Sequence, residues 1–161
     1  MQKATSAFIG PHSYNVVSLE VPGRLECREV VMRTVSAACK LIERMVNEQR
    51  AQHLSLRTEV VSAVGEAYNN IVLHGYAGRE PGPVQMDIEN CPDYVRVVIK
   101  DTGTSFDPSQ ALPPDLSTLP ESGLGIFVMQ SMVDEVSYVA GFPNVLTLVR
   151  RLDGTSGERY Q

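Results

Sequence analysis

Three polar side chains are spaced four residues apart in a stretch that otherwise has the pattern of a buried helix. Glu66, Asn70 and His74 follow V-V-S-A-V and are accompanied by further apolar residues, including I-V-L. At about 100° per residue, they form one polar stripe beside the apolar face of that helix. The stripe is either a solvated edge or one wall of a binding site.

A second candidate group is the carboxylate of Asp101, in D-T-G, at the end of a predicted strand. A carboxylate at this place can accept a hydrogen bond from the exocyclic amine of a ligand. Gly103 follows it and lets the backbone approach closely or adopt a positive φ. The alternative is a turn that begins with aspartate.

A third candidate is the tetrapeptide S-G-L-G, at the start of a short, strongly apolar helix. Backbone N–H groups at a helix N-terminus favour phosphate, and glycines leave them exposed. A flexible hinge or an N-cap is the alternative. Each motif is a weak signal alone, but the three together, in this order, are specific. The four residues of this motif are Ser122, Gly123, Leu124 and Gly125.

The elements that must position these groups follow from hydrophobic spacing and turn residues. Strands are predicted over Tyr14–Val21, Val84–Glu89, Tyr94–Lys100, Glu135–Ala140 and Val145–Leu152. Helices are predicted over Glu26–Gln49, from after the N-cap Ser55 to about Tyr76, and over Leu124–Val133. This order predicts an α+β fold, a two-layer α/β sandwich in which helices cover one face of a mixed, mostly antiparallel sheet. We expect one domain over residues 1–161, with its core at about 14–152 and a frayed tail at 153–161.

Composition excludes several classes of protein. The net charge of −5 argues against direct nucleic-acid binding, which normally needs a basic patch. No window approaches the 18 consecutive apolar residues of a membrane span. The three cysteines have no C-x-x-C spacing, so neither a zinc site nor a disulfide framework is indicated. With no apolar run of a signal peptide at the N-terminus, these features predict a cytoplasmic protein.

The three motifs resemble the conserved boxes of the GHKL ATPase superfamily. E-A-Y-N-N-I-V-L-H-G looks like its N-box, D-T-G its first glycine box and S-G-L-G its second. Within the superfamily, D-T-G-T-S-F-D-P and G-L-G-I-F-V-M-Q-S-M-V-D-E-V-S-Y are similar to the small anti-sigma-factor serine/threonine kinases. The resemblance covers residues 14 to 152 and implies the Bergerat ATP-binding fold.

The resemblance also implies roles for individual residues. Glu66 would be the general base, Asn70 would help to hold Mg²⁺, and His74 would lie near the phosphates, unless it only interacts with the helix dipole. Asp101 would bind the adenine amino group and Gly103 would pack against the base. Ser122, Gly123, Leu124 and Gly125 would line the triphosphate, and residues 104–121 would form the ATP lid.

Two departures from the family pattern concern the adenine end of the site. Ser105 stands where the wider superfamily has a second glycine. The G-T-x that usually enters the last strand, with a threonine at the adenine site, is replaced by G-F-P-N-V. Either Asn144 or Thr147 substitutes for that threonine, or the contact is lost, and Thr147 is our candidate.

The resemblance implies a cytoplasmic ATP- and Mg²⁺-dependent protein serine/threonine kinase that acts as an anti-sigma-type partner-switching regulator. The expected partners are a STAS-domain anti-anti-sigma protein carrying the acceptor Ser or Thr, and a sigma factor or another effector. A homodimer is expected from the family. The alternatives are an inactive, nucleotide-gated anti-sigma binding module, a detached histidine-kinase-like domain and a plain ATPase.

Overall fold

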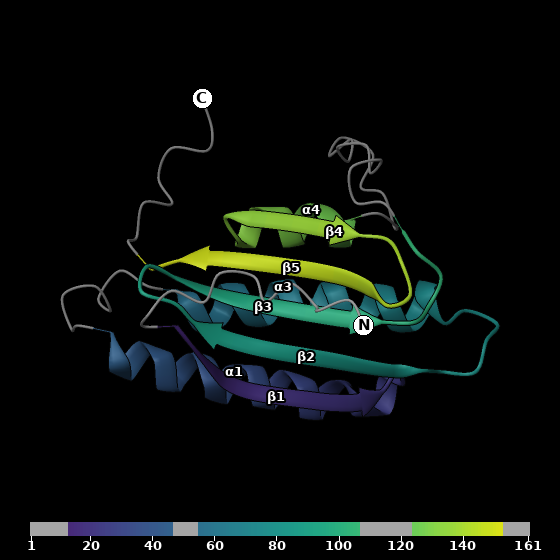
Figure 1. The fold of residues 1–161 in the computed structure, drawn as a ribbon, viewed down its shortest axis with the longest axis horizontal. Coiled ribbons are helices and arrows are strands. Elements are labelled where there is room, and N and C mark those ends of the chain that lie inside the picture. The colour runs from purple at the N-terminus through teal and green to yellow at the C-terminus, as the bar shows by residue number, and fades with distance from the viewer. Residues whose placement is uncertain (1–12, 47–54, 107–123, 153–161) are drawn as a thin grey trace, which may run out of the picture.

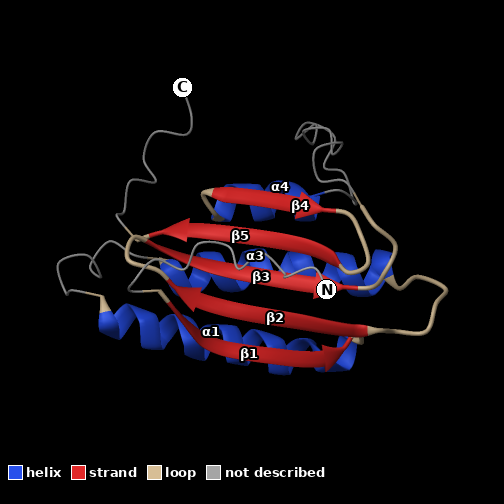
Figure 2. Ribbon diagram, in the orientation of Figure 1, coloured by secondary structure: helices blue, strands red, loops and turns tan. Residues whose placement is uncertain are grey.

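The computed structural model describes residues 13–46, 55–106 and 124–152. They form two layers, with the helices on one face of a five-stranded sheet (Figure 1; Figure 2). The strands, in spatial order, are β1 (Tyr14–Pro22), β2 (Pro83–Asn90), β3 (Tyr94–Asp101), β5 (Asn144–Arg151) and β4 (Glu135–Val139). The helices are α1 (Arg28–Met45), α3 (Leu56–Asn70) and α4 (Leu124–Met132). The α+β sandwich is therefore confirmed.

Every strand pair that the structure describes is antiparallel, whereas the sequence predicts a mixed sheet. The reason is the position of β5. The chain passes from β3 through α4 to β4, and these two strands run in the same direction. Because β5 lies between them and pairs with both, they never form a parallel ladder.

Alternation along β2, β3 and β5 sends one set of side chains into the helical layer and the other to the outer face of the sheet. On β2, Val84, Met86 and Ile88 are buried. They pack with buried residues of α1 and α3 in one hydrophobic core. On β5, the inward residues are Asn144, Leu146, Leu148 and Arg150, so this strand carries two polar groups into the interior.

The helix ends differ from their predicted positions. A 3₁₀ turn, η1 (Leu25–Cys27), precedes α1, and the predicted end of that helix, Gln49, lies outside the described residues. The second helix is α-helical to Asn70 and continues as one π turn, η2 (Ile71–Gly75). In this turn the N–H of Tyr76 donates to the carbonyl of Ile71 at 3.0 Å. Such wider turns recur at functional sites.

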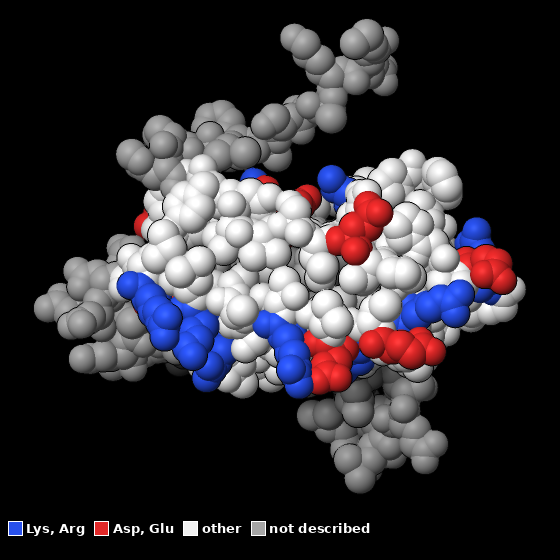
Figure 3. Space-filling model, turned by 90° about the horizontal axis from the view of Figure 1, so that it is seen from below, with Lys and Arg blue, Asp and Glu red and all other residues white. Residues whose placement is uncertain are grey.

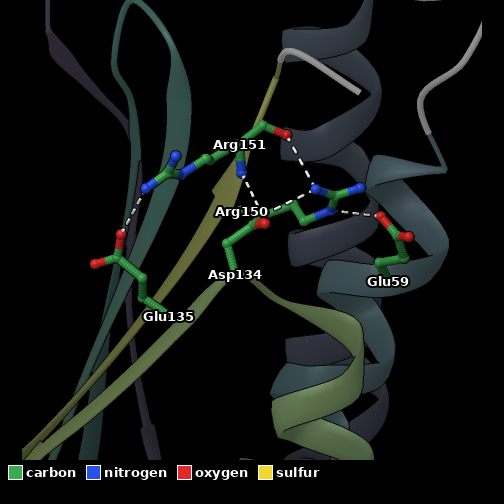
Figure 4. Close-up of polar contacts among 5 residues, drawn as sticks. All are labelled: Glu59, Asp134, Glu135, Arg150 and Arg151. Atoms are coloured by element: carbon green, nitrogen blue, oxygen red, sulfur yellow. Dashed lines mark hydrogen bonds and ion pairs between the residues drawn. The ribbon is translucent and has the colours of Figure 1, made fainter. Parts of the chain in front are cut away.

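A buried ion-pair cluster ties the helices to the sheet (Figure 4). Arg150, only 3% exposed, donates through Nε to Glu59 of α3 at 2.6 Å and through Nη1 to Asp134 at 2.8 Å. Asp134 lies between α4 and β4. Burial lowers the pKa of Arg150, but the hydrogen bonds to the two carboxylates raise it more, so its pKa stays above the ordinary value. The charged guanidinium therefore holds α3, β5 and the end of α4 together.

Within the described part of the chain, no helix has both the length and the apolar character that crossing a bilayer requires.

Candidate functional site

A cleft of 250 Å³ opens where the end of α3, the loop after β3 and the beginning of α4 meet. The three segments come from distant parts of the sequence, and each carries one of the three motifs. Its lining residues are Asn70, His74, Gly75, Thr104, Ser105, Phe106, Gly125 and Ile126.

Gly125 brings the start of α4 against the polar stripe of α3. A Cβ atom built on Gly125 would lie 2.8 Å from Oε2 of Glu66 and 3.5 Å from Oδ1 of Asn70. Any larger residue would occupy the space that these two side chains use. Glu66 and Asn70 therefore do not form a solvated edge, because both side chains lie against the glycine of another motif.

Asn70 holds a hydrogen-bonding group that nothing in the described part of the chain satisfies. Its Nδ2 atom is buried and has no hydrogen-bond partner there. An unpaired buried polar group destabilises a protein by about 1–3 kcal/mol, so such a group in a cleft indicates a place for a ligand. His74, on η2, also lines the cleft but is exposed.

Gly103 lets the loop after β3 press against η2. A Cβ atom built there would lie 2.8 Å from both the carbonyl carbon and the carbonyl oxygen of Gly75. The next residue, Thr104, donates its N–H to that oxygen at 2.8 Å. Side-chain atoms can move aside but these backbone atoms cannot. Position 103 therefore needs a glycine, because the backbones of the two segments touch there.

Asp101 ends β3 with a carboxylate that is 5% exposed. Its Oδ1 atom accepts from the N–H of Gly103 at 2.8 Å and from Nδ2 of Asn144 at 3.1 Å. Both hydrogen bonds that it accepts from the described residues therefore fall on one oxygen. The other oxygen, Oδ2, keeps its capacity to accept from an amine.

Thr147 does not reach this cleft, and our prediction for it is wrong. Side chains alternate along β5, so Asn144 points inward and Thr147, three residues later, points to the outer face. There it lines a separate cavity of 580 Å³, with Arg96 and Arg151. Both arginines are paired with glutamates on the same face, which lowers the net charge of that cavity.

Asn144, the other candidate, is fully buried and makes four hydrogen bonds. Its Nδ2 donates to Oδ1 of Asp101 and, at 3.0 Å, to the carbonyl of Gly103. Its Oδ1 accepts from the hydroxyl of Ser105 at 2.6 Å and from the N–H of Gly141 at 3.1 Å. The amide thus donates two hydrogen bonds and accepts two, which uses its full capacity. Asn144 therefore positions Asp101 rather than contacting a ligand itself.

Other residues at the cleft were not expected from the sequence. The rings of Phe106 and Tyr138 lie 4.5 Å apart, and the Tyr138 hydroxyl accepts from the N–H of Phe106 at 3.1 Å. Tyr76 holds the loop from the other side, since its hydroxyl accepts from the N–H of Thr102 at 3.1 Å. Phe106 lies in the motif segment D-T-G-T-S-F-D-P, and Tyr138 lies in V-D-E-V-S-Y. Their presence in these segments is the sequence signal from which both could have been predicted.

Part of the predicted site falls outside the described residues. Ser122 and Gly123 belong to that part, as does most of the predicted lid, of which only 104–106 are described. Leu124 begins α4.

The residues present suit a magnesium–nucleotide complex. Among the described residues, no group of three or more His, Cys, Asp and Glu side chains could hold a metal ion. A magnesium ion here would need oxygen atoms from a ligand, and it typically takes one or two protein oxygens besides phosphate oxygens. The amide oxygen of Asn70 would supply one such ligand, and its unpaired Nδ2 is a donor that suits a phosphate oxygen. The glycine at the start of α4 leaves room for phosphates, and the accepting oxygen of Asp101 suits the amine of a base.

Comparison with known proteins gives a consistent result. A model of the histidine kinase-like ATPase domain matches residues 29–150. An anti-sigma F factor of Clostridium novyi (strain NT) is 35% identical over 83 residues, which are 49% of this chain and 58% of that protein. An anti-sigma F factor of Bacillus thuringiensis (strain Al Hakam) is 30% identical over 105 residues, which are 62% of this chain and 72% of that protein.

The chain thus spans little more than half the length of the Clostridium relative. The matched residues, 29–150, nevertheless include all three motifs and the segments that line the cleft, while Asp101 itself lines a separate cavity of 290 Å³. The chain belongs to the histidine kinase-like ATPase domain family, in the branch that includes the anti-sigma F factors.

Proposed function

We propose that this chain is an ATP-dependent protein serine/threonine kinase and an anti-sigma-type partner-switching regulator. The family is described as an ATPase domain, and the relatives named above are anti-sigma F factors. The observation that carries the kinase proposal is the position of Glu66. Its carboxylate lies against Gly125, at the start of the helix where phosphates would bind.

ATP would bind with its adenine at the β3 end of the cleft. Asp101 would accept a hydrogen bond from the exocyclic amine through Oδ2, while Asn144 and Gly103 hold its Oδ1. Guanine carries a carbonyl oxygen at the equivalent position, which a carboxylate would repel. This arrangement therefore favours ATP over GTP.

The triphosphate would extend toward α4 and the N–H groups around Gly125, with His74 close by. Asn70 would contribute its amide oxygen to Mg²⁺, and phosphate oxygens would supply most of the other ligands. When bound, the ion neutralises negative charge that would otherwise repel a nucleophile.

Glu66 would act on the incoming substrate. Its carboxylate would accept the proton of a Ser or Thr hydroxyl while that oxygen forms a bond to the γ-phosphorus. The bond from the γ-phosphorus to the bridging oxygen breaks, and ADP leaves. We propose a STAS-domain anti-anti-sigma protein as the acceptor and a sigma factor, or another effector, as the second partner. We further propose that the protein acts in the cytoplasm, that residues 1–161 form a single domain, and that the chain forms a homodimer.

The test is transfer of labelled γ-phosphate from ATP to a purified STAS-domain partner, with and without Mg²⁺. We expect Glu66→Gln to reduce the transfer rate by about 10²-fold or more, which is the usual size of general-base catalysis, while ATP still binds. Glu80→Gln, on an exposed loop, is the matched control and should retain the full rate.

Other outcomes point to the alternatives. ATP binding without transfer by the wild-type chain would support a nucleotide-gated binding module and exclude the kinase. An acid-labile phosphoprotein would indicate histidine phosphorylation, since phosphoserine survives acid. Steady release of phosphate without any partner would indicate a plain ATPase.

A further inference from the structure

The cleft offers little positive charge of its own to a ligand that is rich in phosphate. Among the described residues that line it, none is a lysine or an arginine. The motifs around it carry two carboxylates, Glu66 and Asp101, and the chain as a whole has a net charge of −5. A cation from a neighbouring segment would therefore favour the binding of phosphates here.

Arg79 places a guanidinium beside this cleft. Its Nη1 atom donates to the hydroxyl of Thr104 at 3.3 Å, and Thr104 lines the cleft. The two residues are 25 positions apart in the sequence. The contact therefore joins the turn that follows η2 to the loop that follows β3, at the mouth of the cleft.

The backbone of Arg79 is held in a defined turn. Its N–H donates to the carbonyl of Tyr76 at 3.0 Å, and Gly78, between the two residues, has a φ of +67°, which glycine adopts readily. Tyr76 is buried, and its hydroxyl donates to the carbonyl of Pro83 at 3.2 Å. The turn is thus fixed to the core, while the side chain of Arg79 is exposed and can change its contacts.

Within the described part of the chain, Arg79 forms no ion pair. Its partner is a neutral hydroxyl, at a distance longer than is usual for an N–H···O hydrogen bond. This bond uses a single N–H of the several that a guanidinium offers. Phosphate is a stronger acceptor, and arginine often binds it through two parallel hydrogen bonds. Other described arginines pair with carboxylates, namely Arg33, Arg96, Arg150 and Arg151.

The positive charge at this end of the molecule is local. The turn after η2 lies at the right-hand end of Figure 1. At the same end, Figure 3, seen from below, shows basic and acidic side chains close together rather than a broad basic patch. An anion would therefore be held there by particular hydrogen bonds, and not by the general attraction of a basic surface.

We propose that Arg79 binds the phosphates of the nucleotide and that Thr104 positions it for this contact. Thr104 and Gly125 line the same cleft, so phosphates that lie against Gly125 are within reach of a guanidinium held at Thr104. The guanidinium exchanges the hydroxyl for phosphate oxygens while the turn keeps its place. This inference deepens the proposed function and rests on it, because it takes ATP as the ligand of the cleft.

The first test compares the binding of ATP and of adenosine by the wild-type chain and by Arg79→Gln. Calorimetry with Mg²⁺ measures ATP, and an NMR titration measures adenosine, whose binding is weaker. ATP affinity should fall by about tenfold to a hundredfold, the usual size of a hydrogen bond to a charged group. Adenosine affinity should stay the same, because adenosine has no phosphate.

Arg57→Gln is the matched control. Arg57 is also exposed, but it lies in the first turn of α3, at the end of that helix far from the cleft. This variant should bind ATP as the wild type does. Circular dichroism verifies that both variants fold.

The second test separates positioning from direct contact. Thr104→Val should lower ATP affinity by about threefold or more, and Thr104→Ser, which keeps the hydroxyl, should restore it. In the Arg79→Gln background, Thr104→Val should have little further effect, because no guanidinium remains to be positioned. Additive losses would overturn the role of Thr104.

Two results would overturn the role of Arg79 while leaving ATP binding intact. They are an unchanged ATP affinity in Arg79→Gln, and equal losses of affinity for ATP and adenosine. A wild-type chain that binds no ATP would instead overturn the proposed function together with this inference, so the two failures are distinguishable.

Discussion

At the residue scale, the buried amide of Asn144 organises the loop around Asp101 at the candidate site. Its Nδ2 group donates to Asp101 and Gly103, and its Oδ1 atom accepts from Ser105 and Gly141. The bond to Asp101 falls on Oδ1 and leaves Oδ2 for the adenine amine that we propose. The others join Gly103, Ser105 and Gly141 to the same amide, so the loop after β3 and the turn between β4 and β5 share one buried group.

Replacing Asn144 by Asp would make nucleotide binding depend on pH. Two carboxylates about 3 Å apart cannot both ionise readily, so the pKa of one rises. Above that pKa the pair repels, and ATP affinity should fall by tenfold or more. Below it, the shared proton restores a donor to Asp101 and the affinity should recover. Calorimetric titration at pH 5.5 and pH 8 measures the difference.

The same titration has a matched control in Asn144→Ala. This variant loses the donor at every pH, so its weaker binding should not recover in acid. Equal recovery in both variants would show that the amide does not position Asp101.

At the scale of elements, two glycines bring their segments together by different contacts. The atom nearest to a Cβ on Gly125 is the end of the flexible Glu66 side chain, whereas on Gly103 it is the backbone of Gly75. A side chain can rotate away and a packed backbone cannot. The two positions should therefore respond differently to the same substitution.

Gly125→Ala should leave the fold almost unchanged but displace Glu66. We expect phosphate transfer to fall by at least tenfold and the free energy of unfolding to change by about 1 kcal/mol or less. Gly103→Ala should reduce the free energy of unfolding by about 1–3 kcal/mol, because it overpacks a backbone contact. Urea unfolding and transfer assays on both variants check this. Equal losses of stability would contradict it.

Arg150 joins β5 to α3 through Glu59 and to the segment between α4 and β4 through Asp134 (Figure 4). This contact lies at the end of α3 that is far from the cleft. Arg150→Met would leave Glu59 and Asp134 without their buried cation. Breaking a buried pair destabilises by about 3–5 kcal/mol, and because the carboxylates are 21% and 14% exposed we expect about 2–3 kcal/mol. Arg151→Met, which removes an exposed pair with Glu135, should change stability by less than about 1 kcal/mol in the same urea titration.

At the scale of the whole molecule, burial keeps the side chains of Cys39 and Tyr68 neutral in the described core. Burial raises the pKa of the Cys39 thiol from 9.0 to about 12 and that of Tyr68 from 10.0 to about 12. The folded state therefore keeps these protons at pH values where the unfolded state releases them. The resulting stability is complete below pH 9 and is lost as the pH rises toward 12.

The free energy of unfolding should accordingly fall above pH 9, by up to about 1.4 kcal/mol per pH unit for each group. Cys39→Ala should move the onset to about pH 10, where the tyrosines with raised pKa values contribute. Urea unfolding between pH 8 and pH 11 measures this, and an unchanged onset in the variant would refute the role of the thiol.

The sequence by itself determined the elements and the three motifs, because hydrophobic spacing and glycine placement are local properties. It determined the sandwich for the same reason, since an apolar face must be buried. The spacing of Glu66, Asn70 and His74 could be read directly, but whether they faced water or a site depended on Gly125, more than fifty residues away.

Only the tertiary structure decided where the motifs meet and which substitute holds Asp101. The choice between Asn144 and Thr147 depended on the phase of β5, because a strand sends alternate residues to opposite faces and the sequence does not state where that alternation begins. The antiparallel sheet likewise depended on β5 entering between β3 and β4. Both are long-range outcomes, set by which surfaces bury each other, and no local pattern contains them.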